Sequence, residues 1–241
     1  MSNIYQNIIS STTKNEKLLA VLIDPDKMEL SKVSSFITKA NQSVATHIFV
    51  GGSDVDEGVT DILVSEIKKH TNLPVVLFPG DVIQITDKAD SILFLSLISG
   101  RNPDYLISKH IEAVPRLKNS GLEIIPTGYL LIENGKVTSV QRVSETKPIP
   151  RNHVQIISDT AKAGELLGMK LIYLEAGSGA THPIDAHIIS KVKQELNIPL
   201  IIGGGIRNKT EMEEAYKAGA DLVVIGTAFE KGETFFEELK K

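Results

Sequence analysis

Two glycine-containing segments near the C-terminal end of the chain have the pattern of a phosphate-binding site. Residues 203–205 are three consecutive glycines after an apolar run, and Gly226 and Thr227 follow the next apolar run. Glycines let backbone N–H groups approach an anion closely, and a helix that begins behind them adds a favourable dipole. These glycines could simply form tight turns, but three in succession beside a Gly-Thr pair favour a phosphate cup. The pattern predicts phosphate binding without defining a reaction.

An aspartate and a serine stand after the first two apolar runs of the chain. Asp24 follows residues 18–23, and Ser53 follows residues 47–50 and two glycines. One carboxylate, with waters and the phosphate oxygens of a substrate, is a usual arrangement for Mg²⁺, and a hydroxyl could supply a further oxygen. Asp24 could instead be a turn or capping residue, and Ser53 could cap the next helix. The sequence leaves both roles open for each residue.

A tyrosine and a glutamate two positions apart end another apolar run. Tyr173 and Glu175 would share one face of a strand, because side chains alternate along an extended chain. If these strands form a barrel, Glu175 lies in its mouth, where burying a carboxylate costs free energy unless the group has a function. Glu175 is therefore a candidate general base or ligand of a substrate hydroxyl. The Tyr173 hydroxyl is a candidate hydrogen-bond donor to a bound phosphate. Its alternative role is packing in the core.

The elements that must position these residues are eight short runs rich in Leu and β-branched residues. They alternate with helix-favouring stretches and cover residues 18–23, 47–50, 75–78, 92–97, 123–126, 171–175, 200–202 and 222–225. Eight units in 241 residues average about 30 residues each, the size of a βαβ block, which favours an α/β fold of the closed (β/α)₈ TIM-barrel type. An open doubly wound sheet is the competing fold, but the first run leads into Asp-Pro-Asp rather than a Gly-x-Gly-x-x-Gly turn.

Two of the predicted units are irregular. Only about ten residues separate the third and fourth strands, so the third helix is expected to be short or replaced by extended chain. After the fifth strand, Asn134-Gly135 lies between residues 129–132 and 136–140 and predicts a type I′ hairpin. A polar stretch continues to Asn152, and we expect the insert of residues 134–152 to lie at the active end as a lid.

Composition limits the classes of function. The chain has 26 basic and 30 acidic residues, a net charge of −4, which argues against a general nucleic-acid binder. The absence of Cys excludes disulfides, Cys-ligated metal sites and a thiol nucleophile. No basic stretch followed by an apolar run opens the chain, and no apolar stretch approaches the roughly 20 residues that span a bilayer. We expect one domain over residues 1–241 in a soluble, cytoplasmic protein.

Five motifs taken together resemble one family. Residues 24–27 (Asp-Pro-Asp-Lys), 51–53 (Gly-Gly-Ser), 173–179 (Tyr-Leu-Glu-Ala-Gly-Ser-Gly), 203–207 (Gly-Gly-Gly-Ile-Arg) and 226–227 (Gly-Thr) resemble the geranylgeranylglyceryl phosphate synthase family, whose bacterial relatives include heptaprenylglyceryl phosphate synthase. The match covers essentially the whole chain, and residues 173–179 are its most specific part.

The resemblance implies a modified TIM barrel that joins sn-glycerol 1-phosphate to a polyprenyl diphosphate, releases diphosphate and requires Mg²⁺. It implies that Asp24 and Ser53 hold the metal. With these substrates, the chemistry of Glu175 suits it to take the proton from the glycerol 3-hydroxyl as it attacks, which makes it the candidate catalytic residue. The resemblance implies a glycerol phosphate site made by Tyr173, Leu174, Glu175, Ala176, Gly177, Ser178, Gly179, Gly204, Gly205, Gly226 and Thr227. The resemblance also implies that the helix after the third strand is missing, which opens a groove for the prenyl chain. It implies a homo-oligomer as well, either a dimer or a hexamer.

One position departs from the bacterial heptaprenyl branch. That branch has a Lys two residues before the metal-binding Asp, and this chain has Leu22 there. A C20 geranylgeranyl donor is therefore favoured, with a longer heptaprenyl donor as the alternative. Two different functions stay open as well: a phosphosugar isomerase or aldolase, and a non-catalytic phosphate-binding barrel. A Schiff-base aldolase would need a Lys at the mouth of the barrel, whereas Lys170 precedes the sixth strand and is expected at the opposite end.

Overall fold

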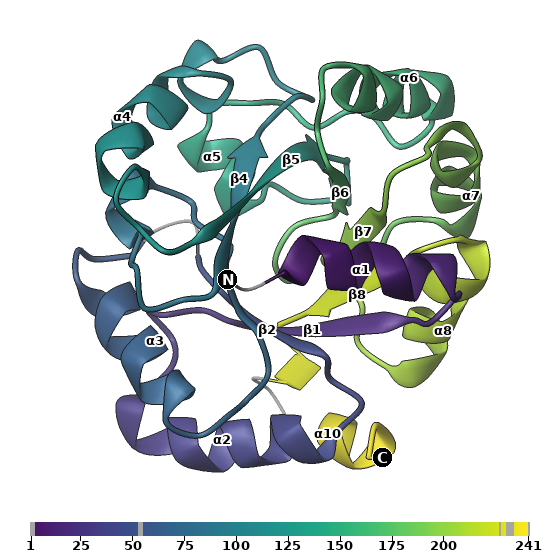
Figure 1. Cartoon of the computed structure of the whole chain (residues 1–241). Helices are drawn as coiled ribbons and strands as arrows, with labels where there is room; N and C mark the ends of the chain where they lie inside the picture. Colours follow the sequence, from purple (N-terminus) through teal and green to yellow (C-terminus); the bar gives the residue numbers. More distant parts are fainter. Residues whose placement is uncertain (1–2, 53–54, 227, 230–233, 241) are drawn as a thin grey trace.

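Eight parallel strands close into a barrel in the order of the sequence, with β1 pairing both β2 and β8 (Figure 1). The computed structural model describes residues 3–52, 55–226, 228–229 and 234–240. The strands are β1 (Leu18–Ile23), β2 (His47–Val50), β3 (Val75–Leu77), β4 (Ser91–Ser96), β5 (Glu123–Leu131), β6 (Leu171–Glu175), β7 (Leu200–Gly203) and β8 (Leu222–Ile225). The predicted (β/α)₈ TIM barrel is confirmed.

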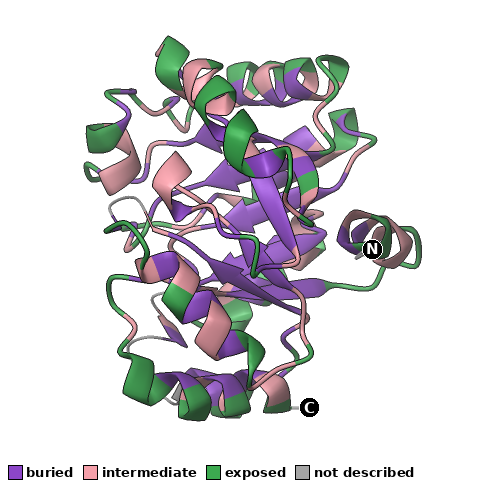
Figure 2. Cartoon of the chain, turned by 60° about the vertical axis from the view of Figure 1, so that its left-hand side comes forward, coloured by how far each residue is buried: buried purple, intermediate pink, exposed green. Residues whose placement is uncertain are grey.

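The helices form an outer layer around these strands, as the exposed outer faces in Figure 2 show. The α-helices are α1 (Ile4–Thr13), α2 (Leu30–Gln42), α3 (Val59–Lys68), α4 (Ser108–Leu117), α5 (Ser139–Val143), α6 (Val154–Leu166), α7 (Ala186–Glu195), α8 (Lys209–Ala218) and α10 (Thr234–Glu238). Two 3₁₀ helices, η1 (Val82–Gln84) and η2 (Pro103–Tyr105), lie between β3 and α4 in the sequence. Among the described residues, no helix combines the length and apolar character needed to cross a bilayer.

Successive side chains along each strand point to opposite faces of the barrel wall, and the two faces form two separate apolar clusters. Inward-facing side chains such as Phe49, Leu93 and Tyr173 fill the barrel, while Ile48, Ile92 and others pack between strands and helices. Both faces of the strands are therefore buried, which explains why the strands are continuous apolar runs in the sequence. The same alternation decides which residues at a strand end point into the mouth of the barrel.

The helix α1 lies across the end of the barrel where the strands begin (Figure 1). Its Ile4 and Ile8 are buried against the inner cluster. The Glu123 carboxylate, at the start of β5, accepts hydrogen bonds from the N–H groups of Ile4 and Tyr5 at 2.6 and 3.0 Å. A carboxylate there satisfies free N–H groups at a helix start and complements the helix dipole. The sequence analysis did not predict this helix, which closes the barrel opposite the site.

The interval after β3 contains the predicted irregularity. The 3₁₀ helix η1 stands where a full helix would follow β3, and Asp81 caps it by accepting a hydrogen bond from the N–H of Ile83 at 3.2 Å. The expected short or replaced third helix is therefore confirmed.

The predicted hairpin around Asn134-Gly135 is wrong. Strand β5 continues to Leu131, and its residues 127–131 pair with β6 in parallel. Residues 136–140 form no strand, and Thr138 instead caps α5 by accepting a hydrogen bond from the N–H of Gln141 at 3.2 Å. The predicted first strand, residues 129–132, pairs instead with β6, which offers a parallel partner. The predicted second strand, residues 136–140, begins a helix because Thr138 caps it.

Candidate active site

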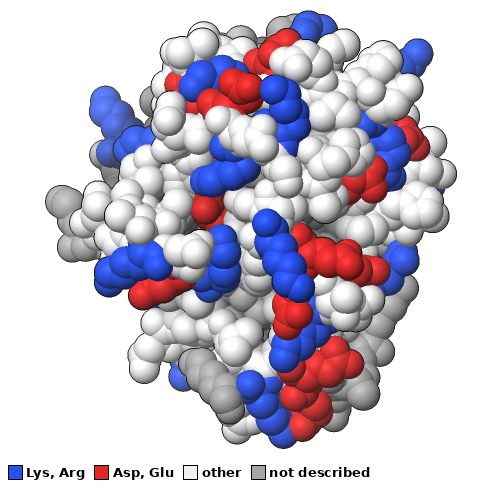
Figure 3. Space-filling model, turned by 90° about the vertical axis from the view of Figure 1, so that its right-hand side faces the viewer, with Lys and Arg blue, Asp and Glu red and all other residues white. Residues whose placement is uncertain are grey.

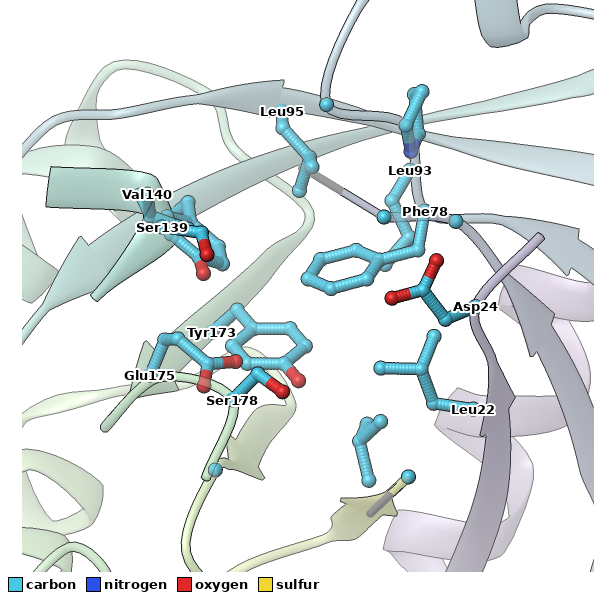
Figure 4. A pocket seen from close by; sticks show the side chains of 18 of the residues that line it. Leu22, Asp24, Phe78, Leu93, Leu95, Ser139, Val140, Tyr173, Glu175 and Ser178 are labelled. Carbon is cyan, nitrogen blue, oxygen red and sulfur yellow. The ribbon is translucent and has the colours of Figure 1, made fainter. Parts of the chain in front are cut away.

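A cavity of about 730 Å³ opens at the end of the barrel where the strands finish. Figure 4 shows Glu175, Ser178 and Tyr173 on one side of it and Asp24 and Leu22 on the other, with Phe78, Leu93 and Leu95 in the upper part of the view. Side chains from strands that are distant in the sequence meet here because all parallel strands end at the same face of the barrel. The cavity thus has a polar side and an apolar side.

Glu175 is the buried carboxyl group of the polar side. Its side chain is only 5% exposed, and Oε1 accepts a hydrogen bond of 2.5 Å from the N–H of Gly177. Burial raises the pKa of Glu175 to about 7, and the Gly177 N–H and the nearby Tyr173 hydroxyl oppose this rise. A carboxyl group with a pKa near neutrality can both take and release a proton under ordinary conditions, as a general base must.

Three aromatic rings line the floor of the cavity beside Glu175. The rings of Phe78 and Tyr173 stack with centroids 5.1 Å apart, and Tyr129 lies 5.3 Å from Tyr173. The Tyr173 hydroxyl is buried without a hydrogen-bond partner of good geometry among the described residues. Burial raises the pKa of Tyr173 well above its usual value, so this hydroxyl stays protonated and can donate to a bound anion. Phe78 was missed as a site residue, although it directly follows β3.

Glycines make close contact possible between the loops after β6 and β7. Gly204 and Gly205 both have φ of +78° and Gly177 has φ of +100°, a backbone region that residues with a Cβ rarely adopt. A Cβ on Gly204 would overlap the Glu175 carboxylate and the Gly177 N–H. Gly204 therefore lies directly against the candidate base.

The predicted glycerol phosphate residues fall into groups. Tyr173, Glu175, Ser178, Gly179, Gly204, Gly205 and Gly226 line the cavity, and Gly177 contacts Glu175. Leu174 and Ala176 are fully buried in the cluster between strands and helices, because they alternate with the inward-facing residues, so only their backbone atoms could reach a ligand. Thr227 lies outside the described residues.

Asp24 lies on the other side of the mouth, with its side chain 19% exposed. Its Oδ2 pairs with Lys27 Nζ at 2.5 Å, and its Oδ1 accepts a hydrogen bond from the N–H of Asp26 at 3.2 Å. The turn and the ion pair hold the carboxylate at the edge of the cavity. No group of three or more acidic or His side chains that could hold a metal occurs in the described ranges, so a cation here would have one carboxylate ligand and would need oxygens from substrate and water. Ser53 lies outside the described residues.

The apolar side of the cavity passes through the wall of the barrel after β3, where the 3₁₀ helix η1 stands in place of an α-helix. Both inward-facing Leu93 and outward-facing Phe94 of β4 line it. Val82 and Ile85 of the η1 segment and Ala113 of α4 continue this side, and His110 and the Asp81–Lys109 ion pair lie beside them. The result is an apolar groove that leads from the polar mouth to the outside of the barrel.

The insert of residues 134–152 covers part of the mouth. Its helix α5 contributes Val140 and Val143 to the cavity lining. Asn134 donates a hydrogen bond from Nδ2 to the carbonyl of Ala176, and the Tyr105 hydroxyl donates to the carbonyl of Val143 at 3.2 Å. The insert is therefore fastened to the loop after β6 and to η2 in this conformation.

Arg207 is a further residue at the site whose role the sequence analysis left unassigned. Its guanidinium donates hydrogen bonds to the carbonyls of Ala180 and Thr181 in the loop after β6. Its placement directly after the three glycines was the available signal. Arg207 connects the loops that follow β6 and β7.

The family model described as PcrB matches residues 11–241. The chain belongs to the PcrB family. A geranylgeranylglyceryl phosphate synthase of Zunongwangia profunda is 60% identical over 233 residues, covering 97% of this chain and 99% of the relative. One from Flavobacterium johnsoniae is 53% identical and covers 98% of both chains. The resemblance stated from the sequence is confirmed.

One solved structure is similar to this chain over nearly its whole length. This is (S)-3-O-geranylgeranylglyceryl phosphate synthase from Thermoplasma acidophilum in complex with substrate sn-glycerol-1-phosphate, with a TM-score of 0.93 and 34% identity. The similarity covers 99% of this chain and 96% of that one.

On the face shown in Figure 3, acidic and basic side chains are interspersed rather than gathered into one basic patch.

Proposed function

We propose that this PcrB-family protein joins sn-glycerol 1-phosphate to geranylgeranyl diphosphate, giving 3-O-geranylgeranyl-sn-glyceryl 1-phosphate and diphosphate. The observation that carries this proposal is a single cavity with a buried base and glycine loops at one side, a carboxylate at the other and an apolar groove leading away. A small phosphorylated acceptor fits the first part, and a prenyl diphosphate fits the other two. The names of the relatives agree with it.

The acceptor would bind between the loops after β6 and β7. Backbone N–H groups of these glycine loops suit a phosphate, and the buried Tyr173 hydroxyl, which stays protonated, supplies a donor from the barrel floor. Glu175 would accept the proton of the glycerol 3-hydroxyl as its oxygen attacks C1 of the donor. With a pKa of about 7, the carboxylate is partly ionised at neutral pH and is therefore available as a base.

The diphosphate of the donor would lie toward Asp24. A carboxylate at the edge of the cavity, in contact with one ammonium group already, has the chemistry of a ligand for a hard divalent cation. Asp24 would hold Mg²⁺ together with phosphate oxygens, and we retain Ser53 as the second protein ligand proposed from the sequence. Bound there, the ion supplies charge neutralisation for the departing diphosphate.

The reacting carbon would lie between the two polar groups, over the stacked rings. As the C–O bond to diphosphate breaks, positive charge develops on allylic C1, and the faces of Phe78 and Tyr173 can stabilise it. Water must be kept from this carbon, and the fastened insert with Val140 and Val143 covers the mouth above it.

Two observations bear on the competing functions. Leu22 lines the cavity where the heptaprenyl branch has a Lys, and with the names of the relatives this favours the C20 donor. Lys170 lies with Nζ 5.0 Å from the ring centroid of Tyr5 in α1, at the far end of the barrel, so it cannot serve a Schiff-base aldolase at this mouth.

We also propose that the chain forms a homo-oligomer, a dimer or a hexamer. Ile107, Ile111 and Val114 are each more than half exposed and follow helical spacing along α4 and the residue before it. An apolar stripe of this kind is typical of a surface that another protein covers. A second copy of this chain is the proposed partner.

The proposed activity is tested directly with purified protein. Incubation with sn-glycerol 1-phosphate, labelled geranylgeranyl diphosphate and Mg²⁺ should give an ether-linked product and one equivalent of diphosphate. Heptaprenyl diphosphate in place of the C20 donor should react more slowly. Binding of glycerol phosphate without product from either donor would instead support a phosphate-binding barrel.

A further inference from the structure

Gln84 is a buried polar residue that the proposed mechanism does not use. It ends η1 and is 1% exposed. Its Nε2 donates a hydrogen bond to the carbonyl of Gly52 at 2.8 Å. Its Oε1 accepts from the N–H groups of Gly52 and Gly80 at 3.4 and 3.3 Å. One side-chain amide thus binds both backbone groups of Gly52.

The end of the ladder between β2 and β3 explains why a side chain takes this position. The ladder between β2 and β3 has its last backbone bond from the N–H of Phe78 to the carbonyl of Val50, at 2.8 Å. The next N–H on the β3 side that faces β2 in a parallel ladder belongs to Gly80, and it donates instead to Gln84 Oε1 at 3.3 Å. The Gln84 amide has the donor and acceptor of a peptide group, so it takes the place that a backbone partner of Gly52 would have in a longer ladder.

Gly52 in turn lies against the carboxylate of Asp24. A Cβ on Gly52 would come within 2.6 Å of Asp24 Oδ1, so no side chain fits between the two. The Gly52 backbone therefore lies directly against the Asp24 carboxylate. Val82 and Ile85, the neighbours of Gln84 in the η1 segment, line the apolar groove.

We propose that Gln84 is a positioning residue for the prenyl diphosphate donor. It holds Gly52 beside Asp24 and connects Gly52 to the wall of the apolar groove, so the diphosphate end and the prenyl end of the donor site share one support. This inference rests on the proposed function. The acceptor site, with Glu175 and Gly204, lies on the other side of the mouth and should be unaffected.

The test compares Gln84→Met with wild type and with Gln155→Met, an exposed matched control on α6. Calorimetry measures binding of inorganic diphosphate with Mg²⁺ and, separately, of sn-glycerol 1-phosphate. For Gln84→Met we expect diphosphate affinity to fall and the KM of the prenyl donor to rise, each about tenfold, the order of magnitude for a lost neutral hydrogen bond. Glycerol phosphate affinity and KM should stay within about twofold, as should every value for the control.

A second variant tests the same contact from its other side. Gly52→Ala places a methyl group against Asp24. It should weaken diphosphate binding and raise the KM of the prenyl donor while leaving the glycerol phosphate values unchanged. This variant tests the positioning role if Gln84→Met does not fold. Equal losses for both ligands, or no loss for either, would overturn the positioning role. A wild-type protein that binds both ligands but forms no product would count against the proposed function, and the split in binding would still be measurable.

Discussion

Glu175→Gln replaces the buried carboxyl group of the site with a neutral amide of the same shape. The amide oxygen can still accept the hydrogen bond from the N–H of Gly177, so the loop after β6 should keep its position. The base is lost, and turnover at saturating substrates should fall by at least ~10²-fold, the lower range for general-base catalysis. In the wild type, turnover should rise with pH through about 7 as Glu175 ionises.

The same substitution should change how stability depends on pH. Burial raises the pKa of Glu175 from its usual 4.5 to about 7 in the folded protein. The folded state therefore binds this proton more tightly than the unfolded state, and the resulting stability is complete below pH 4.5 and is lost as the pH rises through 7. The loss corresponds to roughly 3 kcal/mol above pH 7. A glutamine side chain does not titrate, so the variant should gain about this much relative to wild type between pH 5 and pH 8.5.

Urea unfolding at both pH values measures the free energies, with turnover and calorimetry on the same samples. Glu213→Gln, an exposed position on α8, is the matched control and should change neither quantity. A stability difference between Glu175→Gln and wild type that does not change with pH would refute the argument from burial. A large loss of glycerol phosphate binding with unchanged turnover at saturation would make Glu175 a substrate ligand rather than the base.

Four further substitutions test other parts of the structure. Asp24→Asn should abolish turnover without changing the free energy of unfolding, and unchanged activity at limiting Mg²⁺ would exclude its proposed role. Gly204→Val should raise the KM of glycerol phosphate far more than that of the prenyl donor, because a side chain there meets Glu175, while the unobstructed Gly121→Val should not. Glu123→Ala should cost about 1 kcal/mol of unfolding free energy with unchanged KM values, because α1 loses its N-terminal partner; unchanged stability would contradict this. Ile111→Asp should reduce the molar mass measured by light scattering to that of a monomer, and an unchanged mass would exclude α4 as the interface.

Local pattern in the sequence determined the strands and the polar residues at their ends. Buried parallel strands must be apolar on both faces, so β1, β2, β6 and β8 could be delimited without a structure. Alternation along β6 placed Tyr173 and Glu175 on one face, and the short interval after β3 indicated the missing helix. Each of these inferences needed only the chemistry of neighbouring residues.

Tertiary structure decided what depends on contacts between distant segments. Asn134-Gly135 has the local chemistry of a hairpin, yet β5 found its partner in β6, which follows only after α5 and α6 along the chain. The N-terminal segment forms α1 because the open barrel end offers an apolar surface and the Glu123 carboxylate.

The electrostatics and supports of the site also came only from the fold. The raised pKa of Glu175 comes from burial, which no spacing in the sequence reports. Gln84 reads as an ordinary polar residue in the sequence, and only the fold shows that its amide binds both backbone groups of Gly52 beyond the end of the β2–β3 ladder. Residue type and spacing select which groups can react, whereas burial and long-range packing set their protonation and hold them in place.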